Sequence, residues 1–178
     1  MKLGTPGEPI SMTSEGDLSL DQASCLKYLD LTFCEAHSLI FEEILASCHS
    51  LQKLSLASTL DIQLITSKMI DSICYQNGRT LQTLNLSACK GLDLESIQKI
   101  TKNCAGLKNV ELFNAELSKD SINFLVNNLT PEVEKLSIGS LRNLKDEHVK
   151  ALVARYNKLS VLSLYYTTIT NDSLTYII

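Results

Sequence analysis

Cysteine and histidine are the residue types in this chain that are best suited to bind a metal or to form covalent cross-links. The 178 residues contain six cysteines and three histidines, which are His37, His49 and His148. No two cysteines have the C-x-x-C spacing, and the histidines do not have the H-E-x-x-H spacing, that metal sites use. We therefore expect no metal, no cofactor and no disulfide, and we expect the thiols to pack as small apolar side chains.

The cysteines follow an internal repeat, which is clearest in residues 81–106, LQTLNLSACKGLDLESIQKITKNCAG. This segment opens with apolar residues at Leu81, Leu84 and Leu86, and its apolar period lengthens after Asp93. Alternation predicts a strand, and a spacing of three to four residues predicts a helix. Each unit is therefore expected to be a strand, a turn and a helix, with Cys89 at the turn.

The same pattern begins at residues 26, 51, 81, 107, 133 and 159, in steps of 25, 30, 26, 26 and 26 residues. The motif L-x-x-L-x-L-x-x-C is typical of a leucine-rich repeat. We predict a right-handed α/β solenoid of about six repeats, with a parallel sheet inside the curve and helices outside. The longer second repeat predicts an inserted loop at residues 60–66.

The chain divides at about residue 25. Residues 1–25 are rich in Gly, Pro and Ser, and we expect a mobile tail or an N-terminal cap there. Residues 26–178 are the leucine-rich-repeat domain. Its last apolar helix pattern is still open at Ile178, which predicts that the domain is truncated at its C-terminal end.

Polar residues mark where the helices begin. Asp93, Ser118 and Thr170 precede helical patterns and are expected to be N-caps, because their side-chain oxygens accept from unpaired backbone N–H groups. The helix of the fifth repeat is expected to bury Val149, Leu152 and Val153, together with the corresponding apolar residues of the other repeats.

Repeats of 26 residues with Cys at the turn and at the helix end resemble the cysteine-containing subclass of leucine-rich repeats. That subclass is typical of F-box/leucine-rich-repeat substrate receptors of cullin-RING ubiquitin ligases, including receptors of the S-phase-kinase-associated type. The resemblance implies a protein-binding module that recognises substrates in the ubiquitin-conjugation pathway. It also implies that the ligase adaptor binds only through a segment absent from this chain. The alternative is a free-standing repeat scaffold or regulator without a link to a ligase.

The sheet face is expected to expose the third, fifth, seventh and eighth residues of each repeat. Those residues include no histidine, and their single aspartate and single glutamate lie about three strands apart. The serines have no neighbouring base, and no Gly-rich phosphate loop is present. We therefore predict that the chain is not an enzyme.

Aromatic residues gather towards the two ends of this face. Phe113 and Tyr165 hold the same position in the fourth and sixth repeats, with Gly139 between them. Since neighbouring strands are about 4.8 Å apart, we expect the two rings to stand roughly 10 Å apart and to form the walls of a groove. The alternative is that the tyrosines pack on a seventh repeat and that the glycine only serves a turn. The predicted partner-binding residues are Glu111, Phe113, Lys135, Gly139, Tyr165 and Tyr166.

Charge and hydropathy restrict the class of partner. The formal net charge of −4 argues against nucleic acid or an acidic membrane surface. The sequence has no apolar run of 18 residues and no basic-then-apolar start. We expect a cytoplasmic or nuclear protein whose partner is a protein substrate or a regulatory protein on the concave face.

Overall fold

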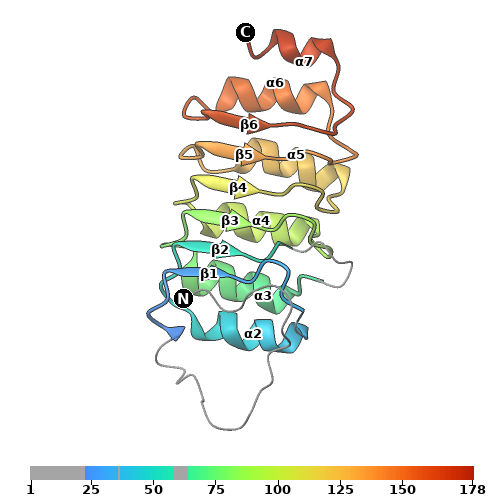
Figure 1. Cartoon of the computed structure of the whole chain (residues 1–178). Coiled ribbons are helices and arrows are strands. Elements are labelled where there is room, and N and C mark those ends of the chain that lie inside the picture. The colour runs from blue at the N-terminus through green and yellow to red at the C-terminus, as the bar shows by residue number, and fades with distance from the viewer. Residues whose placement is uncertain (1–22, 36, 58–63) are drawn as a thin grey trace.

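The computed structural model describes residues 23–35, 37–57 and 64–178, which form a stack of strands beside a stack of helices (Figure 1). Six strands pair in one parallel sheet in the order of the sequence. The strands are β1 (Tyr28–Asp30), β2 (Lys53–Ser55), β3 (Thr83–Asn85), β4 (Asn109–Glu111), β5 (Lys135–Ser137) and β6 (Val161–Ser163). The solenoid of about six repeats predicted from the sequence is confirmed.

The helices follow the strands one by one and pack against one another along one face of the sheet. They are α2 (Ser38–Ser47), α3 (Ser67–Asp71), which continues as the π-helix η1 (Ser72–Gln76), α4 (Leu94–Asn103), α5 (Lys119–Asn128), α6 (Asp146–Arg155) and α7 (Asn171–Thr175). The predicted loop at residues 60–66 lies largely outside the described residues, and so do residues 1–22 of the predicted tail or cap. From residue 64 the chain is described again, and Leu64 forms an isolated parallel bridge with Lys90.

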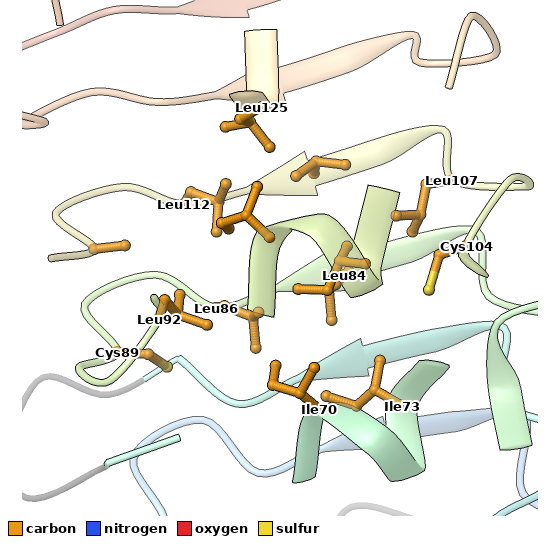
Figure 2. Close-up of a cluster of buried hydrophobic side chains, with 14 of the residues drawn as sticks. Ile70, Ile73, Leu84, Leu86, Cys89, Leu92, Cys104, Leu107, Leu112 and Leu125 are labelled. Carbon is orange, nitrogen blue, oxygen red and sulfur yellow. The ribbon is translucent and has the colours of Figure 1, made fainter. Parts of the chain in front are cut away.

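The core is a column of apolar side chains between the sheet and the helices. The middle residues of the strands lie in one register, in the order Leu29, Leu54, Leu84, Val110, Leu136 and Leu162. Leu54, Leu84 and Leu136 are each 1% exposed, as the repeat predicted. Figure 2 shows how Leu84 and Leu86 point towards Ile70 and Ile73 of the preceding helix. Each repeat therefore buries its apolar edge against its neighbours.

The predicted N-caps are confirmed. Asp93, Ser118 and Thr170 each precede a helix, and each side chain accepts a hydrogen bond from a backbone N–H of the first turn. The hydrogen bonds from the hydroxyl and backbone N–H of Ser96 lower the pKa of Asp93. These caps fix the residue at which each turn becomes a helix.

One expected core residue lies at the surface. Val153 in α6 is 37% exposed, whereas Val149 and Leu152 are buried as predicted. The corresponding Val126 in α5 is fully buried, and the hydroxyl of Tyr156, the C-cap of α6, donates to its carbonyl. The next helix, α7, has five residues where α6 has ten, and it covers less of its neighbour.

A buried asparagine joins the first two repeats, and the sequence analysis missed it. Asn77 is fully buried, its Oδ1 accepts from the Leu51 N–H at 3.0 Å, and its Nδ2 donates to the Cys48 carbonyl at 2.8 Å. In the fourth repeat the corresponding N–H of Leu107 donates directly to the carbonyl of Cys104. The Asn77 amide therefore takes the place of a backbone hydrogen bond and pairs two buried groups that water cannot reach.

We expect Asn77→Ala to lower the free energy of unfolding by about 2–4 kcal/mol, because it leaves a buried N–H and a buried C=O without a partner. Urea denaturation followed by circular dichroism measures the loss. The control is Asn127→Ala, at an exposed amide that donates only within α5, to Asn123. It should change stability by less than about 0.5 kcal/mol. Equal effects of the two substitutions would contradict the bridging role.

A buried histidine joins α5 and α6. His148 is 2% exposed, its Nδ1 accepts from the backbone N–H of Lys145 at 2.8 Å, and its Nε2 lies 2.8 Å from Oδ1 of Asn123. Because Oδ1 can only accept, Nε2 carries the proton and the ring is neutral. Burial lowers the pKa of His148 below its ordinary value of 6.5.

This histidine should make the fold less stable in mild acid. Since its pKa is lower in the folded state, the unfolded chain binds more protons as the pH falls below about 6.5. The stabilisation is therefore complete above that pH and is lost as the pH falls through the folded-state pKa. Free energies of unfolding measured from pH 7.5 to 5 should fall more steeply for the native chain than for His148→Gln. His49→Gln, at an exposed histidine, should keep the native slope, and a native slope in His148→Gln would refute the assignment.

Candidate functional site

The face of the sheet opposite the helices carries two rows of side chains, and we call it the open sheet face. One row consists of Tyr28, Lys53, Thr83, Asn109, Lys135 and Val161, and the other of Asp30, Ser55, Asn85, Glu111, Ser137 and Ser163. All twelve side chains are exposed or half-buried, as predicted. The middle of the face is small and polar. Two residues beyond these rows that were expected to be exposed, Ala57 and Gly139, are buried.

The predicted groove between Phe113 and Tyr165 is closed. The two rings are stacked, with centroids 4.7 Å apart and planes at 25°, whereas the strand spacing predicted a gap of roughly 10 Å. The reason is the missing side chain at Gly139, which lets the rings lean across the intervening repeat and meet. Contact between the ring faces is more favourable than two separate exposed rings.

Gly139 is required for space and not for an unusual backbone angle. A Cβ at this position would lie 2.6 Å from the carbonyl oxygen of Tyr165 and 3.3 Å from Cδ2 of Phe113. The left-handed residue of this turn is the next one, Ser140, with φ 59°. Gly139 therefore does not supply the left-handed residue of the turn, which is Ser140.

Tyr166 extends the stack at an angle. Its ring centroid is 5.8 Å from that of Tyr165, the planes meet at 71°, and its side chain is 84% exposed. Its φ of 57° is left-handed, as it is for Phe33, Ala88 and Asn114 at the same position of other repeats. A left-handed residue with a Cβ costs roughly 1–2 kcal/mol. We call Phe113, Tyr165 and Tyr166 the aromatic corner.

The two predicted charged residues lie near the corner but do not pair with each other. Glu111 on β4 is opposite Ser137, and Lys135 on β5 is opposite Asn109, so the two charges are diagonal neighbours. Both side chains are exposed, and within the described part of the chain neither forms an ion pair. Of the six predicted residues, the structure brings the three aromatics and Gly139 into contact.

A second aromatic group lies at the other end of the face. Tyr28 is 60% exposed and Phe33 is 58% exposed. The ammonium group of Lys53 lies over the Tyr28 ring, 5.2 Å from its centroid. The sequence indicated aromatics at both ends, but it did not predict this cation–π contact.

The cysteines lie mainly in the core. Cys48, Cys74, Cys89 and Cys104 are free thiols and are buried, and burial raises the pKa of Cys48. The Sγ of Cys89 donates to the carbonyl of Leu56. Within residues 23–35, 37–57 and 64–178 no cluster of three His, Cys, Asp or Glu side chains could hold a metal ion. No helix in the same ranges is long and apolar enough to cross a membrane.

We expect Gly139→Ala to lower the free energy of unfolding by about 1–3 kcal/mol, because the new methyl group must displace backbone atoms of Tyr165. Gly106→Ala is the matched control. Its Cβ would lie 3.4 Å from the nearest atom, which is an ordinary contact, and stability should change by less than about 1 kcal/mol. Thermal or urea unfolding measures both. A Gly139→Ala variant as stable as the control would contradict the close approach.

Comparison with known proteins agrees with this architecture. The crystal structure of an internalin (inlF) from Listeria monocytogenes str. 4b F2365 matches with a TM-score of 0.54 and 16% sequence identity. The match covers 89% of this chain and 48% of the internalin chain, so this chain spans about half the length of that protein. At this identity the match supports the fold alone. A family model described as the SKP2 LRR domain matches residues 8–178. Since that match spans nearly the whole chain, the protein belongs to the family of SKP2-type leucine-rich-repeat domains.

Proposed function

We propose that this chain is the substrate-recognition part of an F-box-type ubiquitin-ligase receptor. The observation that carries the proposal is the family match over residues 8–178. Leucine-rich-repeat domains bind proteins. In this proposal the chain holds a protein substrate or a regulatory protein and has no chemistry of its own. The ligase adaptor is reached through a segment outside this sequence, and the protein acts in the cytoplasm or the nucleus.

The open sheet face is the proposed binding surface. Its rows of side chains lie outside the apolar core, which is on the opposite side of the sheet. The residues proposed to form the binding site are Glu111, Phe113, Lys135, Gly139, Tyr165 and Tyr166. Gly139 contributes by letting two of the rings stack, and it does not touch the partner.

The aromatic corner supports this choice of surface. Tyrosine is enriched among the residues that dominate binding energy, since it combines a large apolar area with a polar group. Tyr166 is 84% exposed, and it holds the left-handed turn position that Phe33, Ala88, Asn114 and Ser140 hold in other repeats. The turn of the repeat therefore accounts for its backbone angle, and the exposed ring is what distinguishes this residue.

The test uses the protein expressed from its own gene at its natural length. We expect purification to recover both a partner protein and the adaptor of a cullin-RING ligase, and the partner to be ubiquitinated. Tyr166→Ala should weaken partner binding by about 1–3 kcal/mol, as truncation of an interface anchor does, and should leave the adaptor bound. Binding is measured by surface plasmon resonance with the identified partner.

The matched control is Tyr75→Ala. Tyr75 lies in η1, on the helical side, and is 68% exposed, so the substitution should leave partner binding unchanged. Recovery of a partner without the adaptor would favour the free-standing scaffold over the receptor. Full partner affinity in Tyr166→Ala would remove the aromatic corner from the binding surface.

A further inference from the structure

Two exposed tyrosines elsewhere in the structure have a lysine ammonium group over the ring, whereas the tyrosines of the aromatic corner do not. Lys53 lies over the ring of Tyr28, and Lys150 lies over the ring of Tyr176, each with Nζ 5.2 Å from the ring centroid. In the described part of the chain no lysine or arginine lies over Tyr165 or Tyr166, nor over Tyr75 in η1 on the helical side. Among the described tyrosines of the open sheet face, the rings of the corner are therefore the ones without a cation over them.

The ring geometry leaves room for a cation. Tyr165 is stacked on Phe113, and Tyr166 stands at 71° to Tyr165, so the two tyrosine rings form two walls of a corner. With 84% of its side chain exposed, Tyr166 presents most of its ring to solvent. A cation within about 6 Å of a ring centroid is attracted by the negative ring face.

On the strands of the open sheet face, the charged residues nearest to the aromatic corner are one carboxylate and one ammonium group, which lie on neighbouring strands. Glu111 is exposed, has no ion pair among the described residues, and precedes Phe113 by two residues on the same face, about 7 Å along the strand. Lys135 lies four residues before Gly139, about 13 Å along its strand. The charge nearer to the corner is therefore the carboxylate.

Polar groups at the neighbouring turns add hydrogen-bond acceptors. Asn114 and Ser140 hold the same turn position as Tyr166 in the two preceding repeats, and the Ser140 hydroxyl donates to Oδ1 of Asn114 at 3.4 Å. An amide oxygen, a hydroxyl and a carboxylate beside aromatic rings suit a guanidinium group, which stacks on rings and has five donors.

We infer that the aromatic corner and Glu111 together receive an arginine side chain from an extended segment of the partner protein. This inference depends on the proposed function, because it names the chemistry of the partner at the same surface. The guanidinium stacks on the exposed ring of Tyr166, and the Glu111 carboxylate, two strands away on β4, attracts it without direct contact. An acidic or phosphorylated segment is disfavoured, because it would place like charge beside Glu111.

The test is a titration of the 178-residue chain with a nine-residue peptide of glycine and serine that carries one central arginine. Matched peptides carry citrulline, lysine or glutamate at the centre. Citrulline keeps the shape and hydrogen bonds of arginine but has no charge. NMR of the tyrosine rings should show shifts at Tyr165 and Tyr166 with the arginine peptide, and weaker binding of the citrulline and glutamate peptides.

Substitutions locate the site. Tyr166→Ala should weaken binding of the arginine peptide by about two- to fivefold, as the loss of one exposed cation–π contact does. Glu111→Gln should weaken it by less, because its carboxylate attracts the cation from two strands away. Tyr75→Ala should have no effect. Both site variants should unfold at the native temperature, because neither side chain is buried.

Equal binding of the arginine and citrulline peptides, tighter binding of the glutamate peptide, or the absence of ring shifts would overturn the inference. Any of these results can be told apart from a failure of the proposed function. Loss of the natural partner in Tyr166→Ala together with equal binding of the arginine and citrulline peptides would refute the arginine and keep the binding surface. An absent adaptor would leave the peptide result unaffected and would refute the ligase link.

Discussion

The structure depends on one constraint, which is that no repeat can bury its apolar edge alone. A strand of three residues and a helix of about ten have too little surface to form a core. Leu54, Leu84 and Leu136 are buried only because each of them has the equivalent apolar residue of a neighbouring strand on both sides. At the ends of the sheet, where one neighbour is missing among the described strands, Leu29 and Leu162 are only half-buried. Stability in such a stack is a sum of contacts between nearest neighbours.

Buried polar groups make those contacts specific. Stacking places the helix ends against each other, where backbone N–H and C=O groups are cut off from water and need partners. Asn77, Thr130 and Tyr156 each reach the backbone of the preceding repeat with a side chain. An amide, a hydroxyl and a phenol thus make such a connection in three pairs of neighbouring repeats.

The same constraint leaves one face of the sheet available for binding. Because the helices cover only the core side, the residues of the open sheet face are selected by something other than packing. Most of them are small and polar, whereas the aromatic corner is large and apolar, and Glu111 near it forms no ion pair with the described residues. A surface of this kind agrees with a domain that binds proteins.

The sequence by itself determined the repeat, the parallel sheet, the inward residues such as Leu84, and the helix starts such as Asp93. These features are local, since a period of two or of 3.6 residues and a cap act within a few positions of the chain. Only the tertiary structure decided how side chains from different repeats meet. The stack of Phe113 on Tyr165 and the amide of Asn77 between two backbone groups each join residues more than 25 positions apart. Strand spacing gives the distance between two backbones. The rotamers that bring side chains such as Phe113 and Tyr165 into contact across that distance depend on the packing of all the surrounding residues.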